Sequence, residues 1–170
     1  MTPWPTVEEV HSCSVKCTSN GKVLSQSAVS LNFHSHHLSA MQHDIEEYLR
    51  IKKDIMCSSC FREKMIRPRI SANHIFIETQ CCEDGKLIAS DIKIRLENIS
   101  LSLQWNEQDY TLRGIIATQG KLKTCTSVGH YFAICHRFAH HWELYDDLKA
   151  KKVEVSNSKL VHCQMLLYTL

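Results

Sequence analysis

Two short stretches decide the fold: Gly-His-Tyr-Phe-Ala-Ile-Cys-His at residues 129–136 and Trp-Glu-Leu-Tyr-Asp-Asp at residues 142–147. Both contain aromatic and other apolar residues, and a short polar segment separates them. We therefore predict two antiparallel strands joined by a turn. A turn centred on Phe138 would place three pairs of residues opposite each other: Ile134 and Trp142, Phe132 and Leu144, and His130 and Asp146.

An imidazole beside a carboxylate at the open end of a hairpin forms half of a nucleophilic triad. We expect Asp146 to accept a hydrogen bond from Nδ1 of His130, which leaves Nε2 to take a proton from a thiol or hydroxyl group. The alternative is a hairpin whose end residues are merely polar surface groups.

The chain around this hairpin predicts one mixed domain. Its 170 residues are 44% hydrophobic and 22% charged, which is typical of a globular chain that buries about 70% of its unfolded surface. Beyond Gly85 we expect short strands in a mostly antiparallel sheet over residues 86–89, 92–96, 99–104, 110–119, 129–136, 142–145 and 161–168.

The amino-terminal half is expected to be more varied, with a polar hairpin over residues 13–22, a strand over 23–33 and a strand over 70–79. Ser39 and Gln42 form a capping box, which predicts a short helix from about Ala40 to Lys52. The fold class expected is therefore α+β.

The formal net charge of +2 is too small to indicate a nucleic-acid binder or a protein held on a membrane surface. We find neither an apolar run of the roughly 20 residues that a bilayer demands nor a secretory leader. The expected compartment is the cytoplasm, the nucleus or both, where most cysteines stay reduced.

Four of the nine cysteines form two pairs with the spacing of zinc knuckles, Cys13-x3-Cys17 and Cys57-x2-Cys60. Four thiolates would fill the tetrahedral shell of a zinc ion, so such a metal would be structural. Redox-active or buried free thiols are the alternatives. Adjacent Cys81 and Cys82 cannot easily both bind one ion, and we expect them in a turn before Gly85.

The order and spacing of several motifs resemble the histidine box and carboxyl-terminal part of the ubiquitin-specific protease family. The motifs are Tyr110-x-Leu112, Gly114-Ile115-Ile116, Gly120, Gly129-His130-Tyr131, Trp142-x-x-Tyr145-Asp146-Asp147 and Leu166-Leu167-Tyr168. This resemblance implies one half of a papain-like cysteine protease. It implies a fingers-like region with the four-cysteine zinc site over residues 1–78 and an antiparallel, palm-like region over residues 79–170.

By the same resemblance, His130 would be the general base, Asp146 the residue that orients it, and Asp147 a reserve acidic candidate. The implied activity is thiol-dependent hydrolysis of ubiquitin isopeptide bonds. Two features depart from the family pattern. Thr118 stands where the family usually carries a histidine, and the loop over residues 121–128 is a few residues longer than usual.

No cysteine of this chain lies in the family's cysteine box, so the nucleophile is expected outside the chain, on a thumb half that 170 residues cannot contain. The expected partners are ubiquitin or a ubiquitin-like modifier and that thumb half. One alternative is a catalytically inactive module that binds ubiquitin folds, and another is a relative of the SUMO isopeptidases. A third alternative is a zinc ribbon that binds nucleic acid, and the two cysteine pairs are its only support in the sequence.

Overall fold

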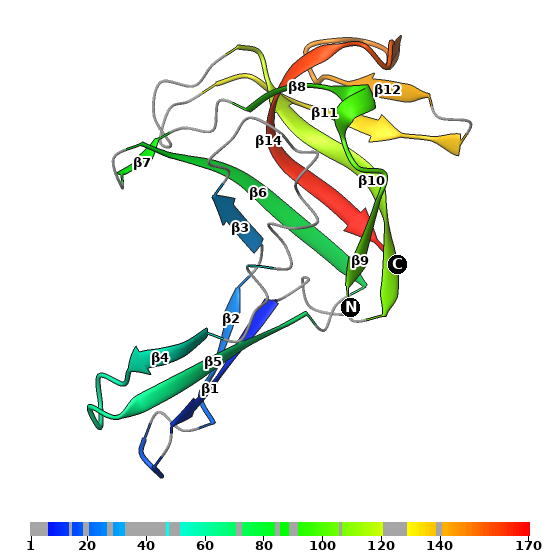
Figure 1. Ribbon diagram of the computed structural model, residues 1–170. Coiled ribbons are helices and arrows are strands. Elements are labelled where there is room, and N and C mark those ends of the chain that lie inside the picture. Colours follow the sequence, from blue (N-terminus) through cyan, green and yellow to red (C-terminus); the bar gives the residue numbers. More distant parts are fainter. Residues whose placement is uncertain are drawn as a thin grey trace.

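A computed structural model gives the chain two β-sheets, a small one that projects from one end of a larger, curved one (Figure 1). The structure describes residues 7–13, 15–18, 21–26, 29–32, 47, 52–70, 73–83, 86–88, 92–105, 107–120, 129–138 and 141–170. The connection between β5 and β6, from Ile70 to His74, runs from one sheet to the other.

The small sheet is antiparallel and has the strand order β2-β1-β5-β4. Its strands are β1 (Val7–Cys13), β2 (Val23–Gln26), β4 (Lys52–Met56) and β5 (Glu63–Ile70). β1 and β2 form the predicted hairpin, and Gly21 closes it with a φ of 76°, a left-handed conformation that glycine adopts without strain. Pro68 lies inside β5, opposite Glu9 of β1 and beyond Ile66, where the pairing of β5 with β4 has ended.

The large sheet has the strand order β13-β12-β11-β10-β14-β6-β3, and these neighbours are antiparallel except for β3, which pairs in parallel with β6. Its strands are β3 (Val29–Asn32), β6 (His74–Glu83), β10 (Gln108–Thr118), β11 (Tyr131–His136), β12 (Trp142–Tyr145), β13 (Val153–Val155) and β14 (Leu160–Thr169). Three shorter strands pair off this path: β7 (Lys86–Ile88) with β6, β8 (Ile92–Arg95) with β14, and β9 (Ser102–Trp105) with β10. The 3-10 turn η2 (Leu96–Asn98) follows β8.

The hydrophobic core lies on one face of the large sheet. Alternation along each strand sends every second side chain inward, as in β12, where Trp142 and Leu144 are buried and Glu143 and Tyr145 are not. The core consists of Ile75, Ile77, Ile94, Leu96, Ile99, Leu103, Tyr110, Leu112, Ile115, Ala117, Ile134, Trp142, Leu144, Val161, Cys163, Leu166 and Tyr168. In the small sheet and its turns, by contrast, the only described side chains that are buried are those of His11 and Cys57.

The mostly antiparallel architecture is confirmed, and seven of the strands expected beyond Gly85 are present with shifts of a few residues at their ends. The sequence analysis missed β13. The helical content that an α+β class requires is not seen in the described residues, which contain η2 and a helical Glu47. The α+β class and the papain-like architecture therefore stay predictions.

Several predicted elements of the amino-terminal half are wrong in detail. The single strand expected over residues 23–33 is two strands, and β2 and β3 belong to different sheets. The strand expected over 70–79 begins only at His74 and continues to Glu83, so it contains Cys81 and Cys82, which were expected in a turn. The expected boundary between the two regions, at residue 78, stays a prediction. The helix expected over 40–52 lies mostly outside the described residues, although Lys52 begins β4.

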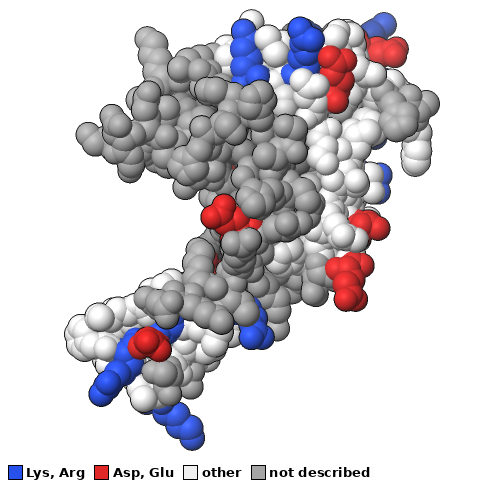
Figure 2. Space-filling view, viewed as in Figure 1, with Lys and Arg blue, Asp and Glu red and all other residues white. Residues whose placement is uncertain are grey.

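Basic and acidic side chains are interspersed over the face shown in Figure 2, in keeping with the small net charge. In the described part of the chain, no helix has the length and apolar composition that crossing a membrane requires.

Candidate functional site

The β11–β12 hairpin positions the predicted histidine and aspartate at its open end. Its register pairs Ile134 with Leu144 and His136 with Trp142, and the loop is closed by a hydrogen bond from Arg137 N to His141 O. The predicted register is therefore wrong by two residues, because the loop is longer than a turn centred on Phe138. A shift of two residues leaves every side chain on its predicted face, since the pleat repeats every two residues.

His130 and Asp146 meet in this structure. Nε2 of His130 lies 2.7 Å from Oδ1 of Asp146, and the two side chains are 24% and 10% exposed. With the observed register they are diagonal rather than direct neighbours, a separation that a histidine side chain can span. Asp146 is held in turn by the N–H of Leu148 at 3.0 Å and by Nζ of Lys149 at 3.6 Å.

The ring of His130 is turned the other way from the prediction. Nε2, not Nδ1, faces Asp146, so Nδ1 is the nitrogen left for another group. Oδ1 of Asp147 lies 3.9 Å from Nδ1, and the Asp147 side chain is 84% exposed. Asp147 thus lies beyond hydrogen-bonding distance, on the solvent side of the pair.

The environment of Asp146 favours its charged form. Burial alone would raise the pKa of this carboxyl group, but the hydrogen bonds from His130 and the Leu148 N–H, together with the nearby charges of His130 and Lys149, lower the pKa below its usual value. Asp146 is therefore a carboxylate at neutral pH and can hold the imidazole in one orientation.

A polar network that the sequence analysis did not single out lies on the opposite face of the same hairpin. Glu143 accepts hydrogen bonds from Arg137 Nε at 2.9 Å and from the Tyr145 hydroxyl at 2.7 Å, and it also pairs with Lys152. These contacts lower the pKa of Glu143 to about 2, and the contact with Lys152 has the largest effect. The network ties β11, β12 and the turn before β13 together. The only indication of this network in the sequence was Glu143, an acidic residue between two core positions of β12.

Thr118, which replaces a family histidine, is buried on the strand next to the candidate histidine. Its hydroxyl donates to the carbonyl of Gly120 at 2.8 Å, and its neighbour across the strand pair is Tyr131. Thr118 is therefore a satisfied structural residue, and the expected loop over 121–128 lies outside the described residues.

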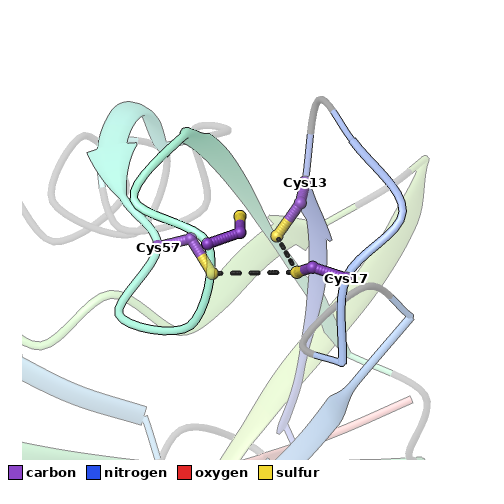
Figure 3. A group of neighbouring side chains, drawn as sticks. Cys13, Cys17 and Cys57 are labelled. Atoms are coloured by element: carbon purple, nitrogen blue, oxygen red, sulfur yellow. Dashed lines mark hydrogen bonds between the residues drawn. The ribbon is translucent and has the colours of Figure 1, made fainter.

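The four cysteines of the two predicted pairs come together between β1 and β2 on one side and β4 and β5 on the other (Figure 3). All four sulfurs lie within 4.8 Å of one another; the Cys13–Cys17 distance is 3.2 Å and the Cys17–Cys57 distance is 3.9 Å. The turn that carries the second pair is closed by hydrogen bonds between Cys57 and the backbone of Phe61 and Arg62.

These residues fit a zinc ion. Four sulfurs at 2.3 Å from a tetrahedral zinc lie about 3.8 Å from one another, close to the spacing observed. Hydrogen bonding to Cys17, burial and the neighbouring sulfurs raise the pKa of Cys13 to about 12, because thiolates placed together repel each other. A zinc ion at their centre would remove the protons from its ligands and turn this repulsion into binding.

Cys135 and Cys163, two further described cysteines, do not resemble nucleophiles. Burial raises the pKa of Cys163 to about 12, and burial also raises the pKa of Cys135. An activated cysteine needs the opposite shift. The group of ligand-type side chains around His130 contains Asp146 and Asp147 and, among the described residues, no thiol.

No protein family model and no curated protein sequence matches this chain. Solved structures do. The yeast SAGA DUB module with an Sgf73 mutant contains a chain 16% identical to this one, with a TM-score of 0.62, over 97% of this chain and 40% of that chain. The SAGA DUB module of a Ubp8 mutant with Sgf11, Sus1 and Sgf73, bound to monoubiquitin, gives 17% identity and a TM-score of 0.61 over the same shares. A further structure of the SAGA Ubp8/Sgf11/Sus1/Sgf73 DUB module gives 16% and 0.60 over 97% of this chain and 37% of that chain.

The chain has a deubiquitinase-like fold. This likeness supports the fold alone, since the identities are low, and it agrees with the resemblance to ubiquitin-specific proteases. The chain spans about 40% of the length of the chains that it matches.

Proposed function

We propose that this chain is the fingers-and-palm portion of a ubiquitin-specific protease, in which His130 and Asp146 serve a thiolate carried by another polypeptide segment. The observation that carries this proposal is the 2.7 Å contact between Nε2 of His130 and Oδ1 of Asp146 in a deubiquitinase-like fold. Asp147, exposed beside Nδ1, is the reserve acidic group.

In this proposal, Asp146 keeps the proton of the neutral ring on Nε2, so that Nδ1 takes the proton of the incoming thiol. The thiolate attacks the carbonyl carbon of the isopeptide bond after the terminal glycine of the modifier. Nδ1 returns its proton to the leaving lysine amine as the carbon–nitrogen bond breaks. Water, deprotonated at Nδ1, then hydrolyses the thioester and releases the modifier.

The small sheet would act as the fingers within residues 1–78, braced by a structural zinc ion on Cys13, Cys17, Cys57 and Cys60, and residues 79–170 would act as the palm. A four-thiolate site leaves no position for water, so the metal takes no part in hydrolysis. The proposed partners are ubiquitin and the segment that carries the nucleophile, and the proposed compartment is the cytoplasm or nucleus.

A second candidate is a module that binds ubiquitin without cleaving it. The observation in its favour is the absence of a thiol near His130 among the described residues. Both candidates require ubiquitin binding, and they differ in whether a nucleophile completes the site.

Two measurements on the purified 170-residue chain test the proposal. The first is calorimetric titration with ubiquitin, with SUMO as the matched control, and we expect micromolar binding to ubiquitin only. The second is incubation with ubiquitin that carries a carboxyl-terminal propargylamide, which reacts covalently with an activated cysteine. We expect no covalent adduct.

Failure to bind ubiquitin would overturn the proposed function, and selective binding of SUMO would replace it by the SUMO isopeptidase alternative. An adduct on a cysteine of this chain would overturn the claim that the thiolate comes from elsewhere. The His130→Gln variant should bind ubiquitin as the unmodified chain does, because His130 is proposed to act on a proton and not to hold the modifier.

A further inference from the structure

The face of the large sheet that points away from the core is mostly apolar across β6, β14, β10 and β11, and the Glu143 network lies beside this region on β12. The strand registers place two rows of side chains across this face, which we call the outer face. One row runs across β6, β14, β10 and β11 through Phe76, Leu167, Gly114 and Cys135, and the next runs through Glu78, Met165, Ile116 and Ala133. Seven of these eight residues are uncharged and six carry apolar or thiol side chains, an unusual composition for a solvent-facing sheet.

A cavity of about 690 Å³ lies over this face, and its lining includes Phe76, Ile116, Ala133, Cys135, Met165 and Leu167. Gly114, Ala133 and Cys135 are small residues, so little fills the cavity over β10 and β11. Gly114 approaches β11 so closely that an added Cβ would lie 2.7 Å from the carbonyl oxygen of Ile134. Ile116 is 39% exposed and Phe138, at the end of the cavity, is 91% exposed.

The dimensions of this trough match one α-helix. The cavity lining reaches from Phe76 on β6 to Cys135 on β11, and β14 and β10 lie between these two strands. Three strand spacings separate β6 from β11, which is about 14 Å, and a helix with its side chains is about 10–12 Å wide. The six residues of β11 are about 20 Å long, the length of about 14 helical residues.

The charged side chains that line the cavity indicate which charge a bound helix should carry. Arg137 is already paired with Glu143 at 2.9 Å. Arg113, which also lines the cavity, donates to the Thr169 hydroxyl at 2.7 Å, and within the described ranges it has no ion pair with an acidic side chain. An acidic residue on the occupant would complement this guanidinium group.

We propose that the outer face binds one amphipathic α-helix whose apolar stripe fills the trough and whose acidic flank meets Arg113. The helix comes from a polypeptide segment outside these 170 residues. The chain accounts for about 40% of the length of the chains that share its fold, so proteins of this fold have further chain available to cover such a face. This inference goes beyond the proposed function and does not depend on it, because the outer face is opposite to the face on which His130 and Asp146 lie.

The test is selection of binders from a displayed library of helix-forming peptides of about 18 residues, with the full 170-residue chain as the target. We expect the enriched peptides to carry apolar residues at spacings of three and four and an acidic residue at one flank. The Ile116→Arg variant should weaken their binding about tenfold or more. Arg113→Glu should weaken it as well, and exchanging the acidic residue of the peptide for lysine should restore it.

The matched control is Val153→Arg, which places the same charge at an exposed apolar position of the edge strand β13 and should leave binding unchanged. If Ile116→Arg changes the melting temperature measured by circular dichroism, the Met165→Lys variant is used in its place. Enriched peptides without helical spacing, or binding that ignores both outer-face variants, would overturn the proposal. Dimerisation of the chain in light scattering that the outer-face variant abolishes would also overturn it, since the occupant would then be a second copy.

Discussion

Replacing Cys57 by serine is expected to unfold the small sheet while the large sheet stays folded. Cys57 is the buried member of the four-cysteine cluster, and serine is a poor zinc ligand. Cys17 and Cys57 are 40 residues apart. A cross-link that closes a loop of this length lowers the entropy of the unfolded chain by about 13 cal/mol/K, which is about 4 kcal/mol at 25 °C.

The small sheet has little else to replace that contribution. Its described residues bury only the side chains of His11 and Cys57, whereas the large sheet has a continuous apolar core. A loss of about 4 kcal/mol is a large part of the stability of an ordinary domain, and among the described residues of the small sheet only two buried side chains remain to offset it.

The assay is amide hydrogen exchange read by mass spectrometry, together with zinc analysis of the purified protein. We expect one zinc ion per chain, lost in Cys57→Ser, with lost protection in β1, β2, β4 and β5 and retained protection in β10, β11 and β14. The matched control is Cys135→Ser, which changes a half-buried thiol outside the cluster and should keep both zinc and protection.

Two results would refute this reasoning. One is a metal-free protein whose small sheet is as well protected as the large one. The other is a variant in which both sheets lose protection together, because the two sheets would then form a single cooperative unit.

Three further predictions concern single residues. Gly114→Ala should destabilise the chain by about 1–3 kcal/mol, and so lower its melting temperature by about 2–12 °C, because the new methyl group meets the Ile134 carbonyl; an unchanged melt would show that β10 and β11 can part freely. Glu143→Gln should lower the free energy of unfolding at neutral pH, because the ion pairs need a charged Glu143. The urea midpoints of the variant and the unmodified chain should therefore converge as pH falls from about 4.5 towards 2. A difference between the two midpoints that does not change with pH would contradict this. Phe61→Gly should raise the stability of the small sheet by up to about 1 kcal/mol, because Phe61 has a φ of 51° and an exposed ring; a lower urea midpoint would show that the ring makes a stabilising contact.

The strands around the site could be predicted from local pattern, and their partners could not. Alternation in residues 142–145 defines β12 to the residue, and it also places His130 and Asp146 on one face whatever the loop length. The register itself depends on the loop, which has no glycine signal, and the prediction was therefore wrong by two residues.

The pairing of strands that lie far apart in the sequence could not be predicted either, because a local pattern does not identify the partner strand. Residues 23–33 were predicted as one strand, but β2 pairs with β1 and β3 pairs in parallel with β6, a contact that only the folded chain defines. The two cysteine pairs were visible because chelating spacing is local, and the prediction that they approach each other followed from the ligand number of zinc. The orientation of the His130 ring depends on side-chain packing and has no signature in the sequence.

The most direct test of the central claim is the position of the proton on the neutral His130 ring. Long-range nitrogen–proton correlation spectra distinguish the two tautomers, and the His130→Gln variant identifies the signal among the eleven histidines. We predict the proton on Nε2, hydrogen bonded to Asp146, and loss of this preference in Asp146→Ala. A proton on Nδ1, or the same spectrum in Asp146→Ala, would contradict the account.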